Sequence, residues 1–515
     1  MQRRSGLLLV VAVAFLYLSG VPFQVYAFTN TQSSTLVLGQ SSFTTDMNAA
    51  SPAGETIPTG LAFDSSGNLW VADSDNSRIL EYTPPFTTGE AASLVLGQAS
   101  LNTGNCDLGG ASASNLCFPT GIAFDSSGNL WVADEANSRV LEYVKGAGFT
   151  TGQAASLVIG QPDFTHSQAN QCGCFAPTAS TLDAPWGLAF DSSGNLWVAD
   201  ANNNRVTEYT KGAGFSTDQA ASLVIGQPGF VTSSAAPISA TSLNRPYQPA
   251  FDSSGNLWVT DDGNARVLEY LKGSGFTTDE AATTVLGQSV FNSGSSNGGG
   301  AISASVLGEA SYLAFDSSGN LWVSDGFGFS TGDSRVLEYS KGSGFSTGEA
   351  ASLVIGQPDF THGQWNQCDC GSLTSQTLDA PAGLVFDSSG NLWVADGGNN
   401  RVLEYAGPSP PPSSLPPVVP QNLVFTLTST GGHLTGNLVA VEGQGILYNI
   451  PGYVPTPGVS VYSYSFCLEA SLNAVLVSGF SNYQAGFNSS EVLVSNYASF
   501  LNNAQGWPAE PACSS

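Results

Sequence analysis

Two short segments each contain a histidine followed by two cysteines in the spacing His-x5-Cys-x-Cys. They are His166, Cys172 and Cys174, and His362, Cys368 and Cys370. Imidazole nitrogens and thiolates are ligands that zinc prefers, and a structural zinc site needs four of them. Neither segment shows an obvious fourth ligand. The residues flanking the two segments are also nearly identical, so duplication of a larger unit explains the repetition as well. Zinc and disulfides are therefore the two alternatives for these loops.

The eight cysteines favour disulfides. Cys106 and Cys117 lie in one loop. In later repeats Cys172 and Cys368 stand at the position of Cys106, lack an equivalent of Cys117, and each gains a second cysteine two residues further on. An even count of cysteines and an export signal, which residues 1–27 resemble, are typical of a disulfide-bonded protein. We predict four bridges: Cys106–Cys117, Cys172–Cys174, Cys368–Cys370 and Cys467–Cys513.

Carboxylates offer a different kind of site. Glu309 with Asp261 or Asp262 supplies oxygen ligands of the type that Ca²⁺ prefers. The chain shows no convergent set of acid, base and nucleophile, so we predict no catalytic residues. No cofactor is predicted, and calcium and zinc are the alternatives.

An aspartate and an arginine recur together in every repeat, as in Asp73 and Arg78. A catalytic group is needed once, whereas a structural contact is needed in each repeat. Because buried charges must be paired, we predict a structural ion pair between neighbouring repeats. By the same reasoning, we predict that the repeated tryptophans pack between neighbouring repeats: Trp70, Trp131, Trp197, Trp258, Trp322 and Trp393.

The elements that position these residues are repeats. The segment FDSSGNLW recurs at Asp64, Asp125, Asp191, Asp252, Asp316 and Asp387. Self-similarity at such a period indicates a propeller, solenoid or array. Each repeat contains four short apolar stretches separated by turn residues, for example 187–190, 195–199, 205–209 and 221–227. Four strands in each repeat predict a propeller blade.

The order of the motifs predicts how the ring closes. A strand ending in LGQ or IGQ precedes the first FDSSGNLW, and none follows the last. The sixth blade therefore lacks its outer strand, which residues 35–40 can supply, leaving no open sheet edge between the two ends of the repeat array. We predict an all-β protein with a six-bladed β-propeller closed by its N-terminal strand.

The repeats resemble the NHL repeat family, whose blades carry a pattern similar to P-x-G-I-A-x-D-x-x-G-N-I-Y-V-A-D-x-x-N-x-R-I. The resemblance covers residues 35–405 and recurs in all six repeats. It implies the propeller fold. Similar propellers include amidating lyases, lactonases, antibiotic-inactivating lyases, RNA binders and protein-binding modules, so the function must be argued from a site.

Blades 4 and 5 differ from the others near the start of the innermost strand. The four residues before the aspartate of FDSSGNLW begin with glycine in the other four blades, but with Gln248 and Tyr312 here. Blade 5 also spaces its aspartate and arginine ten positions apart instead of five. We predict a ligand-binding site at the channel mouth, with drift of the repeats as the alternative. Its residues are Gln248, Tyr312, Tyr247, Phe327 and Phe329.

Four segments are expected along the chain. Residues 1–27 read as a signal peptide, with two arginines, an apolar core and small residues at the cleavage position. Residues 28–406 form the propeller, and the Pro-rich stretch 407–420 is a stiff linker. Residues 421–515 form a small, mostly β domain with a helical tail around 491–502. The mature chain contains no predicted membrane span.

The charge excludes nucleic acid as a partner. The formal net charge is −27, and the basic residues are scattered through the repeats rather than gathered in a patch. We predict a secreted or cell-surface protein that binds a protein or small-molecule ligand at its loop face. The alternative is an extracellular metal-dependent lyase or lactonase, which needs a metal or a general base at the channel mouth.

Overall fold

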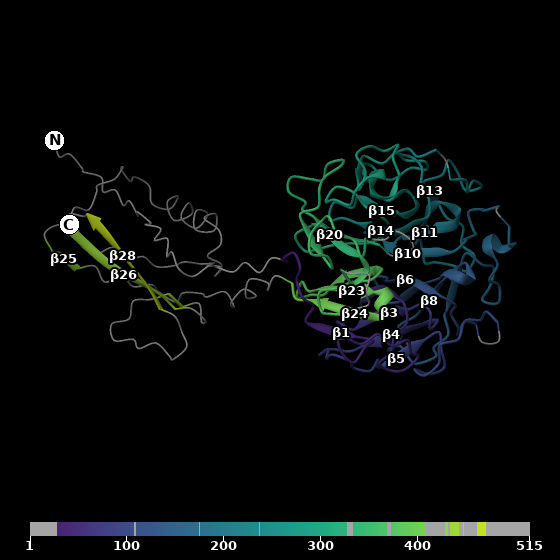
Figure 1. The fold of residues 1–515 in the computed structure, drawn as a ribbon, viewed down its shortest axis with the longest axis horizontal. Coiled ribbons are helices and arrows are strands. Elements are labelled where there is room, and N and C mark those ends of the chain that lie inside the picture. Colours follow the sequence, from purple (N-terminus) through teal and green to yellow (C-terminus); the bar gives the residue numbers. More distant parts are fainter. Residues whose placement is uncertain are drawn as a thin grey trace. The chain divides into compact units, whose positions relative to one another are not determined.

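The computed structural model describes residues 28–107, 110–174, 176–235, 237–326, 333–367 and 372–407, and four strands between 428 and 469. Within residues 28–407, the described strands form six antiparallel sheets of four strands each. Figure 1 shows these sheets arranged as the blades of a ring. The prediction of a six-bladed β-propeller is confirmed.

The first three blades run in chain order from the centre of the ring outward. Their strands are β2 (Pro58–Phe63), β3 (Leu69–Asp73), β4 (Arg78–Tyr82) and β5 (Leu94–Leu96); β6 (Pro119–Phe124), β7 (Leu130–Asp134), β8 (Arg139–Tyr143) and β9 (Leu157–Ile159); and β10 (Pro185–Phe190), β11 (Leu196–Asp200), β12 (Arg205–Tyr209) and β13 (Leu223–Ile225).

Blades 4 and 5 follow the same order, whereas blade 6 contains three strands from its own repeat. They are β14 (Pro246–Phe251), β15 (Leu257–Asp261), β16 (Arg266–Tyr270) and β17 (Thr284–Leu286); β18 (Ala310–Phe315), β19 (Leu321–Asp325), β20 (Arg335–Tyr339) and β21 (Leu353–Ile355); and β22 (Pro381–Phe386), β23 (Leu392–Asp396) and β24 (Arg401–Tyr405).

Short 3-10 turns follow the second strand of four blades or lie in the long connections. They are η1 (Glu135–Asn137), η3 (Ala201–Asn203), η4 (Asp262–Asn264) and η7 (Gly397–Asn399) after second strands, and η2 (Ala169–Gln171), η5 (Ser296–Gly299) and η6 (Trp365–Gln367) in connections.

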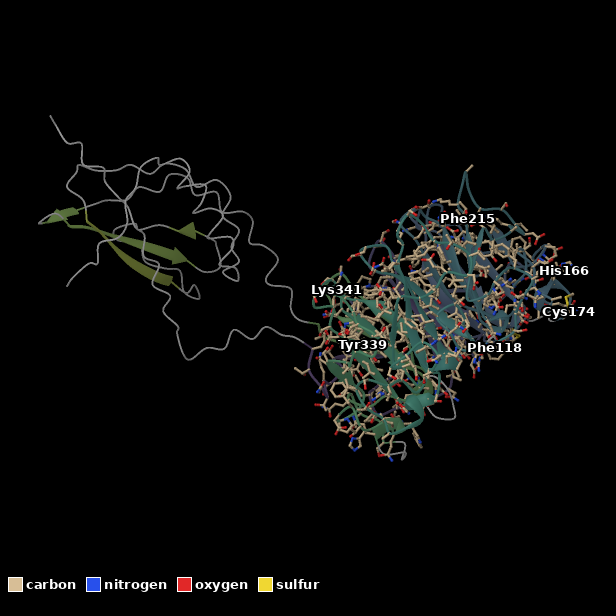
Figure 2. The ribbon with its side chains drawn as sticks, turned by 90° about the horizontal axis from the view of Figure 1, so that it is seen from above. Phe118, His166, Cys174, Phe215, Tyr339 and Lys341 are labelled. Carbon is tan, nitrogen blue, oxygen red and sulfur yellow. A yellow bond between two sulfur atoms is a disulfide. The ribbon has the colours of Figure 1, made fainter. Side chains whose placement is uncertain are left out.

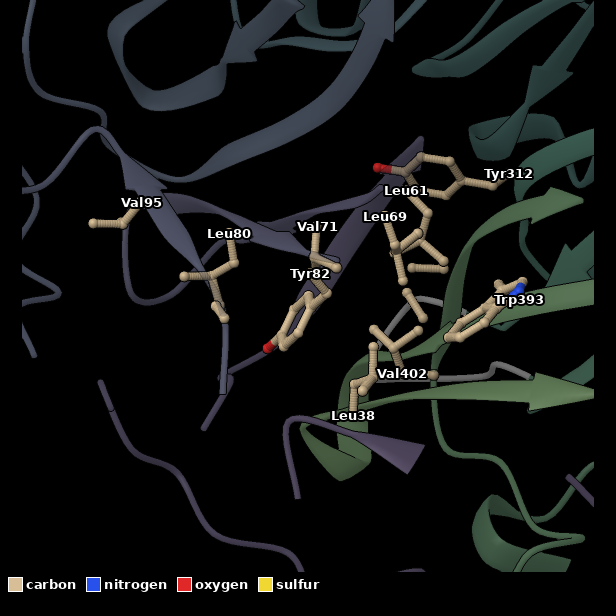
Figure 3. Close-up of a cluster of buried hydrophobic side chains, with 14 of the residues drawn as sticks. Leu38, Leu61, Leu69, Val71, Leu80, Tyr82, Val95, Tyr312, Trp393 and Val402 are labelled. Carbon is tan, nitrogen blue, oxygen red and sulfur yellow. The ribbon is translucent and has the colours of Figure 1, made fainter. Parts of the chain in front are cut away.

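The N-terminal strand closes the ring as the motif order predicts. Strand β1 (Leu36–Leu38) pairs with β24 of blade 6, with Val37 opposite Leu403. Phe28 packs edge-on against Trp322, with ring centroids 4.8 Å apart. Figure 3 shows Leu38 close to Trp393 and Val402 of blade 6 in the buried cluster that continues into blade 1.

The FDSSGN turns are hydrogen-bonded hairpins. In blade 1 the Asp64 Oδ1 atom accepts hydrogen bonds from the amides of Ser66 and Asn68, at 2.8 and 3.0 Å. Gly67 adopts φ +82°, a conformation that side chains disfavour. This local geometry joins the first two strands of the blade and leaves the aspartate engaged in the turn.

The repeat tryptophans pack between neighbouring blades, as predicted. Trp70 of blade 1 lies against Phe124 and Phe149 of blade 2, with ring centroids 5.9 and 4.8 Å apart. Equivalent tryptophan and phenylalanine contacts occur at the other junctions. These edge-on contacts bury large apolar surfaces where blade meets blade.

The Asp–Arg pairs are structural, but the prediction that they join two blades is wrong. Asp73 and Arg78 lie opposite each other in one blade, and the Arg78 Nε atom donates to Asp73 Oδ2 at 2.6 Å. The remaining guanidinium nitrogens donate to backbone carbonyls of the connecting loops, such as Leu101 and Gly54. Both side chains are fully buried. Each pair therefore holds the loops against its own blade.

Residues Tyr26–Pro408 form one compact unit. Separately, the C-terminal segment contains an antiparallel sheet of β25 (Thr428–Thr430), β26 (His433–Val441), β27 (Ile446–Leu447) and β28 (Val461–Glu469). Its strands coincide with the β-rich stretches of the sequence, and the predicted helical tail lies outside the described residues. In the described part of the chain, no helix has the length and hydropathy that crossing a bilayer requires.

Candidate functional site

All six inner strands begin on the same face of the ring, which we call the loop face. The first residue of each inner strand pairs with the repeat aspartate, as Pro58 does with Asp73. The outer strands end on this face, so the long connections between blades cross it. The register also places both ends of the 326–334 connection of blade 5 here, because Asp325 pairs with Arg335. The lengthened connection of blade 5 therefore starts and ends on the loop face.

The third residue of the inner strand explains why blades 4 and 5 differ. In blades 1, 2, 3 and 6 it is glycine, and a Cβ atom there would meet the next inner strand's backbone. At Gly121, for example, that Cβ would lie 2.3 Å from the Trp186 carbonyl oxygen. Only blades 4 and 5 have room for a side chain, and Gln248 and Tyr312 occupy it. The ring is therefore asymmetric at its centre.

The second residue of the inner strand also differs between blades. Blades 1 and 2 carry Thr59 and Thr120, whose hydroxyls donate to carbonyls of the following inner strand. Blades 3 and 4 instead carry Trp186 and Tyr247, whose rings stack with centroids 4.3 Å apart and planes within 11°. This parallel aromatic pair occurs where inner strands of several blades converge.

Arg245 extends the aromatic pair with a charge. Its Nη2 atom donates to the Tyr247 hydroxyl, and its guanidinium lies 5.5 Å from the centroid of the Tyr247 ring. The Arg245 side chain is exposed, unlike the six arginines of the repeat pairs. It therefore presents hydrogen-bond donors on the loop face, beside an aromatic surface.

Arg245 interacts electrostatically with carboxyl groups of blades 2 and 4. Burial raises the pKa of Asp262 to about 7, the Arg245 guanidinium opposes the increase, and Glu309 adds to it. Burial also raises the pKa of Glu135, with a further increase from Asp134 and an opposing effect of Arg245. Glu135 and Asp262 each directly follow the repeat aspartate of their blade. The mouth thus combines aromatic rings, one guanidinium and several partly buried carboxylates.

The predicted ligand-binding residues lie in several environments. Tyr247 belongs to the aromatic pair. Tyr312 is only 4% exposed and packs in the same central cluster, where burial raises its pKa. Gln248 donates through Nε2 to the carbonyl of Leu188 at 3.2 Å. Phe327 and Phe329 lie outside the described residues. A role of these side chains in binding stays a prediction, although packing already accounts for Tyr312.

The His and Cys segments show disulfide chemistry in the described chain. Cys106 bonds to Cys117 and Cys172 to Cys174, as predicted. His166 pairs instead with Asp163, Nδ1 to Oδ1 at 2.7 Å, and Figure 2 shows His166 and Cys174 at the outer edge of the propeller. The other predicted cysteine side chains, at positions 368, 370, 467 and 513, lie outside the part that the structure describes.

The second histidine segment has the same ion pair. The His362 Nδ1 atom lies 2.8 Å from Asp359 Oδ1, and this contact lowers the pKa of Asp359 to about 2. Among the described residues, three metal-ligating side chains come within 4.8 Å of one another only at Cys106, Asp107 and Cys117, where the sulfurs are already bonded together.

The predicted calcium ligands are divided between two environments. Asp261 belongs to the buried pair with Arg266, Nε to Oδ2 at 2.7 Å. Asp262 lies at the mouth, where Glu309 affects its titration. Asp262 and Glu309 are thus the two members of this group that the fold brings to one place.

Comparison with protein families identifies NHL repeats in the propeller sequence. The NHL repeat profile matches residues 56–82, 116–143, 182–209 and 378–405. The propeller thus contains NHL repeats in four of its six blades. The matched segments lie in blades 1, 2, 3 and 6, which are the four blades with glycine at the third position of the inner strand.

One curated relative is peptidyl-alpha-hydroxyglycine alpha-amidating lyase 2 of Drosophila melanogaster, 27% identical over 232 residues. The match covers 45% of this chain and 46% of the relative, so it spans about half of the relative's length. Similar solved structures include a virginiamycin B lyase from Staphylococcus aureus, which is 14% identical and has a TM-score of 0.38. The match covers 70% of this chain and 97% of the lyase chain. A protein of unknown function from Bacteroides thetaiotaomicron has 14% identity, 73% and 76% coverage and a TM-score of 0.44.

Sequence reasoning missed Trp186 and Arg245. The sequence did contain a clue to Arg245. Of the Lys and Arg residues outside the signal peptide, Arg245 is the one that belongs neither to the repeated Asp–Arg pairs nor to the repeated Lys-Gly-x-Gly-Phe turns. Comparing the second residue of each inner strand across the repeats would have found Trp186. Attention to the third residue led instead to Gln248 and Tyr312, which fill the centre of the ring.

Proposed function

We propose that this NHL-repeat propeller is a secreted or cell-surface binding protein that recognises a protein or small-molecule ligand at its loop face. The observation that supports it is the stacked pair of Trp186 and Tyr247, with Arg245 beside it. Aromatic and arginine side chains contribute most of the binding energy at many interfaces. The export signal predicted at residues 1–27 supports the extracellular location.

The residues at the mouth favour particular contacts. Phe118 is 41% exposed and, like Arg245, directly precedes an inner strand. Aromatic side chains and a guanidinium suit a ligand with a flat or apolar group. Glu135, Asp262 and Glu309 outnumber the single arginine once they are ionised, and the whole chain carries a formal net charge of −27. The electrostatic field therefore disfavours anionic ligands, and nucleic acid above all.

The proposal is tested with a panel of immobilised peptides and oligosaccharides of positive, neutral and negative charge. We expect the full-length protein to retain members that are neutral or positive. Trp186→Thr introduces the residue that blades 1 and 2 carry at this position. It should lower the affinity about 30-fold, because an aromatic anchor contributes roughly 2 kcal/mol to binding. Thr59→Ala is the matched control at the same strand position, and it should retain binding.

The outcomes separate a loop-face site from other sites. Equal binding by Trp186→Thr and the wild-type protein would place the ligand elsewhere. The melting temperatures of both variants show whether a loss reflects unfolding.

An extracellular metal-dependent lyase or lactonase is the second candidate, supported by the similarity to the amidating lyase and by the proximity of Asp262 and Glu309. Carboxylates at the mouth can hold a divalent cation such as calcium, which would polarise a substrate oxygen. Incubation with lactones and with peptidyl-α-hydroxyglycines, with and without chelator, tests it. Turnover of either substrate supports catalysis if both the chelator and the Asp262→Asn substitution abolish it. A ligand that is bound and recovered unchanged supports the binding protein instead.

A further inference from the structure

Glu55 is buried at the junction that closes the ring. It lies in the connection before β2 of blade 1 and is fully buried. Its carboxyl group packs on Gly39, directly after β1, so closely that a Cβ atom on Gly39 would lie 2.7 Å from Glu55 Cδ. The side chain therefore fills the space between blade 1 and the strand that completes blade 6.

The other five junctions have leucine at this position. A glycine directly after the outer strand packs there on a leucine of the following connection, as Gly97 does on Leu116. The remaining pairs are Gly160 with Leu182, Gly226 with Leu243, Gly287 with Leu307 and Gly356 with Leu378. A carboxyl group thus replaces an apolar contact only at the junction where the two ends of the repeat array meet.

The carboxyl group has one hydrogen-bond partner in the described structure. The Tyr82 hydroxyl donates to Glu55 Oε1 at 2.8 Å, and Oε2 is buried without a partner. At the five equivalent tyrosines, the hydroxyls are buried without a partner in the described residues. A buried, singly bonded carboxyl group is far less costly as the neutral acid than as the anion.

Three titratable or charged groups face Glu55, namely Asp73, Arg78 and Tyr82. Burial raises the pKa of Glu55 to about 8, and Asp73 adds to the increase, whereas the hydrogen bond from Tyr82 and the charge of Arg78 oppose it. Arg78 is already paired with Asp73 at 2.6 Å. Ionised Glu55 would therefore add a second buried carboxylate to a guanidinium that is already neutralised.

We propose that the ring closure is sensitive to pH: the proton on Glu55 keeps β1 packed in blade 6, and loss of this proton loosens β1. A proton that is bound in the closed ring and released on opening favours the closed form at acidic and neutral pH. This stabilisation is lost as pH rises from the ordinary glutamate pKa of 4.5 to the raised pKa of about 8, and above that value both the closed and the open form carry the charge. The inference does not depend on the proposed ligand site.

Amide hydrogen exchange of the full-length protein between pH 6 and 9.5, corrected for intrinsic exchange, tests the proposal. Between about pH 6 and pH 8, protection of the segment containing β1 should fall about tenfold per pH unit, because opening releases the proton of Glu55. Above about pH 8 the protection should level off, because the closed ring has already lost that proton. The internal control is β5, which makes the equivalent contact through Leu116. Its protection should change less with pH.

Two variants separate the proton from packing. Glu55→Leu introduces the residue of the other junctions, and Glu55→Gln keeps the shape and an acceptor for Tyr82. Either variant should remove the loss of protection at β1 between about pH 6 and pH 8. Should Glu55→Leu fail to fold, Glu55→Gln decides alone. A wild-type β1 that follows the profile of β5, or a loss between about pH 6 and pH 8 that persists in Glu55→Gln, would overturn the proposal.

Discussion

Trp186 and Tyr247 occupy equivalent positions of consecutive inner strands and stack with ring centroids 4.3 Å apart. Blades 1 and 2 use threonine at this position to bond one inner strand to the next. The repeat therefore does not require aromatic rings here. Because Arg245 also contacts Tyr247, one sector of the loop face differs in chemistry from the rest of the ring.

Deleting residues 28–41 should strongly lower the melting temperature and the soluble yield. The deletion removes β1, leaves β24 as an open sheet edge and takes Phe28 away from Trp322. Thermal unfolding and soluble expression measure the effect. Melting at the temperature of the full chain would show that closure by β1 is not needed.

Non-reducing peptide mapping should recover Cys106 linked to Cys117 and Cys172 linked to Cys174. A bridge between Cys467 and Cys513 is expected from the sequence alone, because these two are the cysteines of the C-terminal domain. Finding Cys106 and Cys117 as free thiols in protein from an oxidising compartment would contradict both the pairing and the extracellular location.

Arg139→Ala should lower the free energy of unfolding by about 3 to 5 kcal/mol, because Asp134 would be left buried without its charged partner. The variant also loses the hydrogen bonds from Arg139 to the Phe164 and Ser112 carbonyls. Denaturant unfolding provides the measurement, and Lys145→Ala on an exposed turn is the control. A loss below 1 kcal/mol would mean that the pair contributes little.

Asp333 makes the stability of blade 5 depend on pH, and replacement of Asp333 by asparagine should remove this dependence. The other five blades carry asparagine at this position, and its side chain donates to the repeat aspartate, as Asn137 does to Asp134 at 2.9 Å. Asp333 instead shares Arg335 with Asp325. Burial, followed by the charge of Asp325, raises the pKa of Asp333.

A raised pKa in the folded state means that proton uptake stabilises the fold at low pH, and that this contribution is lost as pH rises through the raised value. Asp333→Asn should therefore be more stable than the wild type at pH 9, by a margin that shrinks towards pH 5. Denaturant unfolding at several pH values tests this. A variant that is less stable than the wild type at pH 9 would contradict it.

The repeat made the fold predictable, and its exceptions were harder to interpret. Blade number, strand order and closure by residues 35–40 follow from motif order, because each FDSSGNLW unit must build the same hairpin. The partners of the repeat arginines did not follow, since sequence spacing does not show which loop carbonyls Arg78 can reach.

The candidate site was only partly predictable. Tyr312 and Gln248 stood out as departures from glycine. Whether they pack at the centre of the ring depends on how closely the neighbouring backbones approach, and the sequence does not show that distance. The contact between Trp186 and Tyr247 joins residues of two repeats, so no single repeat reveals it.

Covalent surface footprinting of the wild-type protein, with and without a ligand selected from the panel, tests the central claim most directly. We predict ligand-dependent protection at Trp186, Arg245 and Phe118 on the loop face, and none at the hairpin-turn serines Ser192 and Ser253 on the opposite face. Protection of those serines with unchanged labelling of Trp186 and Arg245 would contradict the proposed site.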